Sequence, residues 1–441
     1  MLPEVAMILL ALLLNIFLTM ILDGINYIPA TALRWALRRE GHLDLNSNPR
    51  IFSSTKSFAP TSWTVNIFSG IALVMAYGGT SVLTYQVYVQ GLANNHSQLI
   101  STDVSGERYG IDFNSWGFIG LGIGIVIQSA IASWTLVEAR HMIVTWNANP
   151  IGTARACYMM VQRDENNHNQ LHYDAAGIAF SQPSNIQPSM SNYTPLVRSI
   201  ANIVWTIAAI ICVWTAIVGI IAHKSGTTTS EFVEYNAGNN DALSYWQLYG
   251  QVGIKFTHDA YLKRRDWLGL IIQCLVLSII TLGLHFVECV CHVWRDEAIW
   301  RKAATVGVNP NRGAVLEGIA NWPCCVLFFF KTFIHWIFGY AFSTDVFAFM
   351  TLLPMVTLAV CFILLVVFVE FLIRWRPRGY QPVTYGDIER LIAFIDEWDH
   401  ERIFWGDKGE LRKGFRKAGT TGHRLGDLVP DKWYRNLRGN S

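Results

Sequence analysis

Long apolar runs alternate with polar segments along the whole chain, and seven of these runs are long enough to cross a lipid bilayer. A hydrocarbon core of about 30 Å needs roughly 20 helical residues. Inside lipid the backbone N–H and C=O groups must be satisfied within the segment, which favours helices. The pattern therefore predicts an all-α, polytopic helical membrane protein with about seven transmembrane helices. The predicted spans are approximately Val5–Leu22, Trp63–Val87, Trp116–Leu136, Ile200–Ala222, Trp267–Val290, Trp322–Phe342 and Val346–Arg374.

The first and the sixth runs allow other interpretations. No Lys or Arg precedes the first run, and no small-x-small cleavage site follows Leu22, which favours a retained helix over a cleaved signal peptide. Few residues separate Trp322–Phe342 from the next run, so two spans there require a tight helical hairpin. If the sixth run were re-entrant or lay on the membrane surface, the chain would cross six times. Seven crossings is the preferred prediction.

Lys and Arg are concentrated in alternate connecting segments, and this asymmetry indicates the orientation in the membrane. Arg108 is the only Lys or Arg in segment 88–115. In segment 223–266 the triplet Lys263-Arg264-Arg265 disagrees with an outward placement, but several acidic residues in the same segment reduce its weight. We therefore predict that 88–115 and 223–266 are outward loops, with the N-terminus outside and the C-terminus inside. The basic segments, placed inside, are 23–62, 137–199, 291–321 and the tail after Val369.

Two glycosylation sequons test this orientation. Asn95-His96-Ser97 lies in an outward loop, so Asn95 is the predicted glycosylation site. Asn192-Tyr193-Thr194 lies in an inward segment and precedes Pro195, so Asn192 should stay unmodified.

The chain divides into a transmembrane domain, 1–375, and a cytoplasmic tail, 376–441. Between about 160 and 196 the sequence is rich in polar residues and poor in aliphatic ones, which predicts a mobile cytoplasmic insert. In the tail, Thr384 and Asp387 resemble a capping box. An apolar stripe at helical spacing follows, which predicts an amphipathic helix on the inner face of the membrane or beneath the bundle. The stripe consists of Ile388, Leu391, Ile392, Ile395 and Trp398.

Composition supports the membrane assignment and excludes several classes of function. Charged residues make up 15% of the chain, whereas soluble domains average about 25%. The net charge of +2 and the lack of a basic stripe with interleaved aromatics argue against a nucleic-acid partner. The cysteines lie in predicted spans or inward loops, which argues against an extracellular disulfide framework. No motif predicts a cofactor.

Ionisable residues inside predicted spans are costly in lipid and are therefore candidates for function. The fifth span ends with His285, Glu288 and His292, whose spacing places them on one helical face. The sixth span carries Lys331 and His335, and the seventh carries Glu370. We expect Lys331 to pair with Glu288 or, as a second choice, with Glu370.

Three interpretations of this intramembrane polar cluster compete. It could be a structural network of ion pairs and hydrogen bonds, or it could line a path for an ion, a proton or a small solute. It could also bind a metal through His285, Glu288, His292 and His335, but this interpretation is disfavoured, so no metal ligand is assigned. The His-rich boxes of membrane hydroxylases and desaturases are missing, so the chain is not expected to be an enzyme.

Small residues in the third span favour close helix contacts. Gly120 and Gly124 form a small-xxx-small pair, and Gly117 lies one turn before Gly120. These glycines could pack against neighbouring helices of one bundle, or they could form an interface between subunits. The expected partners are therefore the lipid bilayer, individually bound lipids and further copies of the chain in a homo-oligomer.

Seven spans with an outward N-terminus invite comparison with seven-helix receptors. No DRY-type triplet follows the third span, which ends Val137-Glu138-Ala139-Arg140-His141. The last span has neither an NPxxY motif nor a Lys that could bind retinal. The receptor interpretation is therefore rejected.

The chain contains six short motifs that are distinctive as a set: Thr145-Trp146-Asn147-Ala148-Asn149-Pro150, Gly283-Leu284-His285-Phe286-Val287-Glu288, Arg295-Asp296-Glu297-Ala298-Ile299-Trp300-Arg301, His335-Trp336-Ile337-Phe338-Gly339, Tyr385-Gly386-Asp387 and Trp405-Gly406-Asp407-Lys408-Gly409. These motifs resemble those of a group of uncharacterised multi-pass membrane proteins of filamentous fungi. The resemblance covers most of the chain and implies a fungal source, but it implies no substrate, cofactor or mechanism.

Together these features predict an oligomeric channel- or transporter-like protein for an ion or small solute, located in the plasma membrane or an endomembrane. The alternative is a self-associating scaffold that organises a membrane region through its small-residue faces and its tail.

Overall fold

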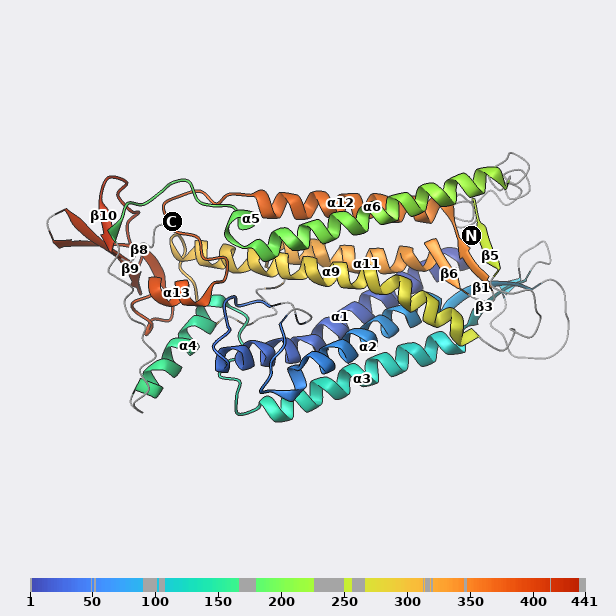
Figure 1. Ribbon diagram of the computed structural model, residues 1–441, viewed down its shortest axis with the longest axis horizontal. Coiled ribbons are helices and arrows are strands. Elements are labelled where there is room, and N and C mark those ends of the chain that lie inside the picture. Colours follow the sequence, from blue (N-terminus) through green and yellow to red (C-terminus); the bar gives the residue numbers. More distant parts are fainter. Residues whose placement is uncertain are drawn as a thin grey trace.

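Helices form most of the structure, and seven of them are long and apolar enough to cross a membrane, as predicted (Figure 1). This computed structural model describes residues 2–48, 50, 53–89, 101–102, 108–165, 180–225, 250–255, 266–311, 313, 318, 320–344, 347–412 and 414–435. The predicted glycosylation site, Asn95, lies outside these residues. The seven helices are α1 (Leu2–Arg39), α2 (Trp63–Val82), α3 (Ser115–Ala139), α6 (Pro195–Lys224), α9 (Asp266–Ala303), α11 (Trp322–Ala341) and α12 (Leu352–Arg374).

Four of the seven helices are longer than predicted, and α1 and α9 exceed their predicted spans the most. Helices α1 and α9 contain 38 residues each, because both continue past the end of their apolar run. The extension of α1 buries Leu33, Trp35 and Ala36 in a second core beyond the bundle. The predicted sixth span forms one continuous helix, α11, of 20 residues, and does not turn back on itself as a re-entrant segment would.

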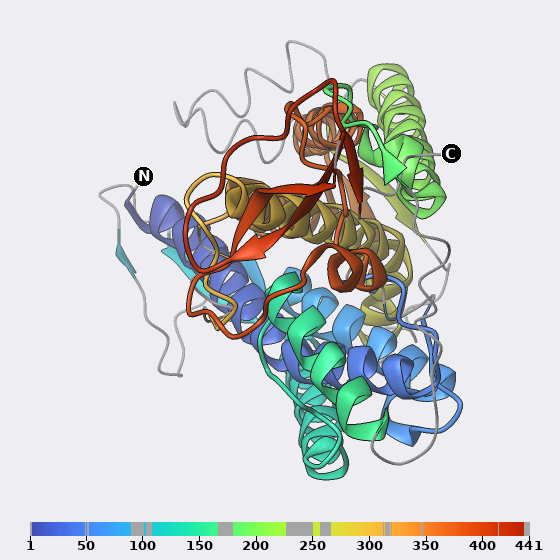
Figure 2. The same ribbon diagram turned by 90° about the vertical axis from the view of Figure 1, so that its left-hand side faces the viewer.

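The bundle has three layers, which the end-on view separates (Figure 2). Helices α6 and α12 pack together on one side, and α1, α2 and α3 form the opposite layer. Helices α9 and α11 lie between them and contact both layers, so a polar group on either helix is covered from both sides.

At one end of the bundle the connections form small antiparallel sheets. One contains β1 (Thr84–Val89), β2 (Ser101–Thr102) and β3 (Arg108–Phe113). The other contains β5 (Val252–Lys255), β6 (Phe342–Thr344) and β7 (Phe347–Met350). Helices α11 and α12 pack against each other as expected, but β6 and β7 connect them in place of a short turn. The aromatic and Thr residues of this connection favour strands. The all-α prediction is wrong in this respect.

The opposite end carries the tail and the remaining short elements. Three strands of the tail, β8 (Phe404–Arg412), β9 (Phe415–Thr421) and β10 (Trp433–Arg435), form a four-stranded sheet with β4 (Phe180–Ser181) in the order β4-β10-β9-β8. The sequence did not predict this sheet. The other elements at this end are η1 (Ala59–Thr61), α4 (Pro150–Glu165), α5 (Met190–Tyr193) and α13 (Ile388–Phe394).

The tail helix α13 is shorter than the sequence indicates. It begins at Ile388 and is capped by Asp387, whose side chain accepts from the Arg390 backbone N–H at 3.0 Å, whereas the predicted capping box places the cap at Thr384. It ends at Phe394, because the backbone N–H groups of the next residues donate to Thr420 Oγ1 instead of continuing the helix. The five residues of the predicted apolar stripe are nevertheless buried: Ile388, Leu391, Ile392, Ile395 and Trp398.

Part of the predicted mobile insert is packed against the tail. Met190 is fully buried, and the Tyr193 hydroxyl donates to Asp387 Oδ2 at 3.0 Å. Gln187 donates to the Gly379 carbonyl at 3.3 Å. Residues 180–195 thus form part of the fold, whereas 166–179 lie outside the described residues.

Candidate functional site

The Lys331 ammonium is held between carboxylates of two other helices. Its Nζ donates to Glu288 Oε2 on α9 at 2.9 Å and to Asp23 Oδ1 on α1 at 3.0 Å. The Lys331 side chain is only 3% exposed, whereas the exposed fractions are 27% for Glu288 and 33% for Asp23. The Asp23 pair therefore joins the middle layer to the α1–α3 layer, and the Glu288 pair joins the two helices of the middle layer. Solvent reaches the carboxylates of the cluster rather than its ammonium.

His285 completes this group, which we call the charged cluster (Asp23, His285, Glu288 and Lys331). Its Nδ1 lies 2.9 Å from the same Glu288 oxygen that binds Lys331. The two residues are three positions apart on α9, a spacing that places side chains next to each other on a helix surface. With His285 neutral, two carboxylates face one ammonium, so the charged cluster carries one net negative charge.

The sequence analysis missed Asp23 because it ended the first span at Leu22. Helix α1 continues without interruption to Arg39, so Asp23 lies well inside the candidate span Ile8–Arg39. The available signal was the apolar pattern that resumes after this single acidic residue.

His335 lies one turn beyond Lys331 but joins a different set of contacts. Its Nδ1 lies 2.7 Å from the Lys331 backbone carbonyl, which can only accept, so Nδ1 carries the proton. Its Nε2 then accepts from the Thr281 hydroxyl at 3.1 Å. The ring stacks on Tyr77 with centroids 3.8 Å apart, and the Tyr77 hydroxyl lies 3.4 Å from Thr19 Oγ1. His335 is thus a neutral, hydrogen-bonded neighbour of the charged cluster.

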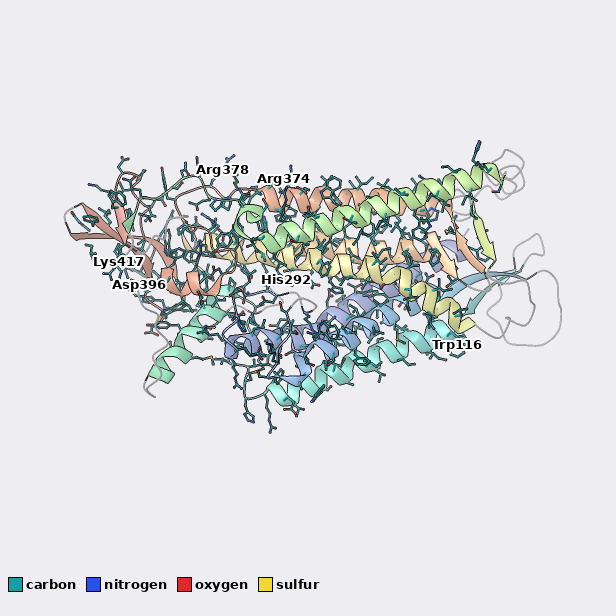
Figure 3. All side chains as sticks on the ribbon, viewed as in Figure 1. Trp116, His292, Arg374, Arg378, Asp396 and Lys417 are labelled. Atoms are coloured by element: carbon teal, nitrogen blue, oxygen red, sulfur yellow. The ribbon has the colours of Figure 1, made fainter. Side chains whose placement is uncertain are left out.

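Glu370 and His292 do not join the charged cluster. Glu370 accepts from Trp205 Nε1 at 2.9 Å and pairs with Arg374 at 2.6 Å, on the outer side of α12. His292, labelled in Figure 3, makes no hydrogen bond or ion pair with any residue that the structure describes. Within the same residues no three His, Cys, Asp or Glu side chains gather as metal ligands.

Polar residues continue along α9 on both sides of the charged cluster. Towards the β6 end, Gln273 is fully buried and donates to Ser81 Oγ at 3.1 Å and to the Phe342 carbonyl at 2.9 Å. Towards the tail end, the Cys289 thiol lies 4.0 Å from the Ser47 carbonyl. The spacing of three, four or eight residues keeps these positions on one face. We call this set the α9 polar row: Gln273, Thr281, His285, Glu288, His292 and Asp296.

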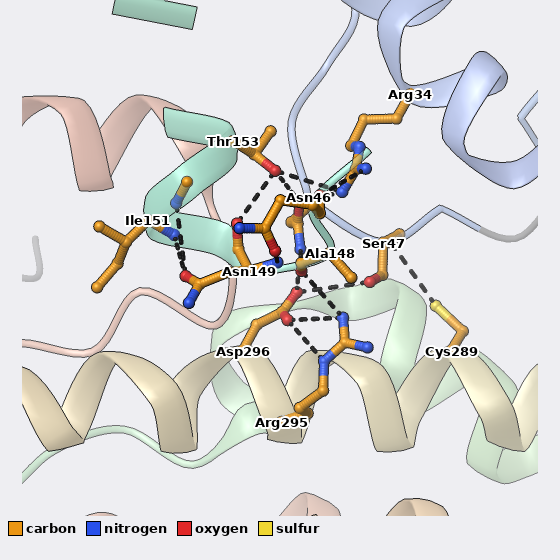
Figure 4. A network of polar contacts seen from close by, with 12 residues as sticks. Arg34, Asn46, Ser47, Ala148, Asn149, Ile151, Thr153, Cys289, Arg295 and Asp296 are labelled. Atoms are coloured by element: carbon orange, nitrogen blue, oxygen red, sulfur yellow. Dashed lines mark hydrogen bonds and ion pairs between the residues drawn. The ribbon is translucent and has the colours of Figure 1, made fainter. Parts of the chain in front are cut away.

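The tail end of the α9 polar row is a buried hydrogen-bond network (Figure 4). Asn46 donates through Nδ2 to Asp296 Oδ2 at 3.0 Å and to the Ala148 carbonyl at 2.9 Å. Arg295 donates to Asp296 Oδ1 at 2.9 Å, and Arg34 donates to Asn46 Oδ1 at 2.8 Å. Because Asp296 is completely buried, these bonds fix α1, α9 and the segment before α4 relative to one another.

The tail attaches to the next residue of α9. Glu297 Oε2 accepts from the backbone N–H groups of Thr384 and Tyr385, each at 2.8 Å. Its other oxygen accepts from Arg301 Nε at 2.7 Å. The residue is 2% exposed, so the tail is held by a buried carboxylate on the same helix that carries the charged cluster.

The three glycines of the third span pack inside the bundle. A Cβ on Gly124 would lie 2.7 Å from the Ala72 carbonyl oxygen of α2, and one on Gly117 would lie 2.9 Å from the Gly79 carbonyl oxygen. A Cβ on Gly120 would lie 2.8 Å from Leu270 of α9. The small-residue face therefore serves contacts within one chain.

No protein-family model, curated protein or solved structure matches this chain. The resemblance to fungal multi-pass membrane proteins accordingly stays a hypothesis.

Proposed function

We propose that the protein moves a proton or a small cation across a membrane, with the charged cluster as the binding site and the α9 polar row as the path. The observation that supports this proposal is Lys331 between two carboxylates, near the middle of a helix of 20 residues. Charged side chains inside the bilayer cost several kcal/mol, and in membrane proteins they commonly mark ion pathways and proton relays.

The charge balance favours a cationic substrate. A structural ion pair needs one carboxylate for one ammonium, and a second carboxylate leaves negative charge in a region of low dielectric. A proton on Asp23 or His285, or a small cation between Asp23 and Glu288, would neutralise it. The charged cluster is therefore built to exchange one positive charge.

The exposure of the carboxylates supports a water-accessible path. Asp23 and Glu288 are only partly covered by protein. Because a carboxylate facing lipid would be costly, the exposed parts of these two side chains are more stable in contact with water. From there, His335, Thr281 and Gln273 lead along the bundle towards β6. Each of these side chains can both donate and accept, as a proton relay requires.

The orientation and assembly belong to the same proposal. The basic connecting segments and the tail lie at one end of the bundle, and Trp116 marks the other end (Figure 3). From the positive-inside rule we propose that the tail faces the cytoplasm and that the opposite end, which carries β1, β2, β3, β5, β6 and β7, faces outside. We propose a homo-oligomer in the plasma membrane or an endomembrane, with α13 beneath the bundle on the inner side.

The test is flux into liposomes that contain the purified full-length protein. An imposed pH gradient should drive proton entry, read by a trapped pH dye, and a Na⁺ or K⁺ gradient tests the cations. Asp23→Asn and Glu288→Gln should each abolish flux while the protein stays folded. Glu370→Gln is the matched control, because it removes an intramembrane carboxylate outside the charged cluster. Flux that survives both cluster variants would refute the proposal.

The scaffold alternative was based on the small-residue faces and on the tail. Gly117, Gly120 and Gly124 contact α2 and α9 of the same chain, so this small-residue face is used within the bundle. We therefore prefer the transport proposal.

A further inference from the structure

A cavity of about 600 Å³ lies at the tail end of the molecule, away from the charged cluster. Its walls come from the end of α9, the loop that follows, the start of α11 and the tail. Cavities of roughly 300–1,000 Å³ are typical of small-ligand sites. The described lining consists of Ile299, Lys302, Val306, Gly307, Val308, Asn309, Ala320, Asn321 and Arg402.

Both charged residues of this lining are positively charged. Lys302 and Arg402 come from α9 and from the tail, and the described lining contains no carboxylate. Neither side chain forms an ion pair or hydrogen bond with a residue that the structure describes. Both side chains are exposed, so they lie where the cavity meets solvent. Two cations from distant parts of the chain at one cavity, with no carboxylate in its described lining, favour an anionic ligand.

Asn321 supplies a second, independent indication. The residue is 7% exposed, and its Oδ1 is buried without a hydrogen-bond partner. It precedes the first residue of α11 but makes no side-chain capping bond. A buried amide oxygen without a partner costs about 1–3 kcal/mol. Asn321 lines the cavity, and a turn of its amide that brings Oδ1 to the cavity surface would let a ligand hydroxyl satisfy it.

The cavity lies at the level where lipid headgroups are expected. Trp322 follows Asn321 directly, is 46% exposed and packs edge-on against Trp294 with centroids 5.7 Å apart. Trp375 contacts Trp294 at the same centroid distance of 5.7 Å. Exposed Trp side chains at helix ends mark the membrane–water interface.

We propose that this cavity binds a phosphate group with neighbouring hydroxyls, such as that of a phosphorylated inositol lipid. Lys302 and Arg402 would bind the phosphate oxygens, Asn321 would accept from a hydroxyl, and Ile299 and Val306 would contact the apolar part of the ligand. This proposal is independent of the proposed transport function.

Binding can be measured by native mass spectrometry and thermal shift on the purified full-length protein. The probes are a short-chain phosphatidylinositol phosphate, phosphatidylcholine of the same chain length, inositol phosphate and inorganic phosphate. We expect the inositol lipid to bind and phosphatidylcholine not to bind. Competition by inositol phosphate or inorganic phosphate at similar concentrations would identify a soluble ligand, and its absence would identify the lipid. Failure of all three phosphate probes to bind would overturn the proposal.

Variants locate the site. Lys302→Gln combined with Arg402→Gln should weaken phosphate binding at least tenfold. The control is Arg376→Gln combined with Arg378→Gln, which removes the same charge from exposed positions at the same end and should leave binding within about twofold. Equal effects of the two pairs would show general electrostatic attraction and would contradict a defined site.

The variant Asn321→Asp tests whether the ligand group next to residue 321 is negatively or positively charged. It keeps the size of the side chain and places a negative charge beside the cavity, so binding of a phosphate should fall. The thermal unfolding temperature of the variant, measured without ligand, shows whether its fold is intact. Stronger binding of the lipid by this variant would mean that a cationic group occupies the position, and the proposal would be wrong.

Discussion

Lys331 and Asp23 form an ion pair with 3.0 Å between Nζ and Oδ1, although 308 positions separate them in the sequence. This pair attaches the first helix to the middle layer of the bundle. The pair is unusual because a second carboxylate binds the same ammonium: Lys331 Nζ also donates to Glu288 Oε2 at 2.9 Å. The bundle therefore holds an acid–base–acid group where a single pair would satisfy the lysine.

The first prediction concerns Lys331→Met. The substitution leaves two carboxylates without their cation. Breaking a fully buried pair in this way costs about 3–5 kcal/mol, and because Asp23 and Glu288 are partly exposed we expect a loss of about 3 kcal/mol or less. Adding Asp23→Asn and Glu288→Gln to it should recover most of the loss, because no charge then stays behind. Thermal unfolding in detergent measures both effects.

Lys224→Met is the control for this series. Lys224 is exposed near the end of α6, so its loss should leave the unfolding temperature within about a degree, because exposed charges contribute little. A triple variant no more stable than Lys331→Met alone would show that stability comes from packing of the lysine stem rather than from charge. If the cluster lines a path, the triple variant should be folded and yet show no flux.

The second prediction separates relay from stability. Thr281→Val removes the hydroxyl that donates to His335 Nε2 and keeps the shape of the side chain. The unpartnered nitrogen should cost about 1–3 kcal/mol of unfolding free energy, and proton flux in liposomes should fall. Thr281→Ser restores the donor and should restore flux. Flux unaffected by the Val variant would remove His335 from the path.

Spacing and hydropathy were sufficient to predict the seven spans and one of the two partners of Lys331, Glu288. Glu288 and Lys331 lie at similar depths on consecutive spans, and a membrane leaves a buried ammonium few other partners. Asp23 was missed because a charged residue after an apolar run was interpreted as its end. Whether a helix continues past such a residue depends on a partner elsewhere, here Lys331, which local sequence does not reveal.

The strands at both ends were missed for a related reason. β6 and β7 are short, and their hydrophobic residues continue the apolar runs of α11 and α12. A short apolar run does not separate a strand from a helix by its composition. In the tail, Gly406 lies in β8 and Gly419 lies in β9, and the two residues pair with each other. Glycine is unfavourable in strands, so local composition did not indicate this sheet.

The third prediction compares two glycines of α3. Gly124→Ala should destabilise the protein by about 1–3 kcal/mol, because its Cβ would clash with the α2 backbone and the contact cannot give way easily. Gly122→Ala should stabilise it by up to about 1 kcal/mol, because nothing lies within 4 Å of its Cβ and alanine favours the helix. Thermal unfolding and size-exclusion chromatography report both. Loss of an oligomer in the Gly122 variant with unchanged stability would reveal an interface on that side.

The fourth prediction is a pH dependence of the tail. Burial alone would raise the pKa of Asp396, but hydrogen bonds from Lys417, the Thr420 backbone and Lys408 outweigh it and lower the pKa to about 2. Since the folded pKa lies below the ordinary value of 3.8, the stabilisation is present above that pH. It is lost as the pH falls from about 4 towards about 2, and it amounts to at most about 2 kcal/mol.

Hydrogen exchange of the β8–β9 backbone amides against pH measures this effect. Asp396→Asn should raise exchange at neutral pH and flatten the dependence below pH 4. The exposed Asp399 gives the control, and Asp399→Asn should leave the profile unchanged. Equal profiles for wild type and Asp396→Asn would show that the two lysines do not stabilise the tail through this carboxylate.

The last prediction fixes the side from which the charged cluster is reached. Asn95 lies in a segment that follows β1, and Asn192 is exposed in α5 at the opposite end of the bundle. With the tail in the cytoplasm, only Asn95 can meet the glycosylation machinery. Expression in a eukaryotic cell followed by glycosidase treatment should shift the wild-type band, and Asn95→Gln should abolish the shift, while Asn192→Gln should have no effect. A glycan on Asn192 alone would invert the orientation, place β6 on the cytoplasmic side, and reverse the direction in which the α9 polar row leads from the charged cluster.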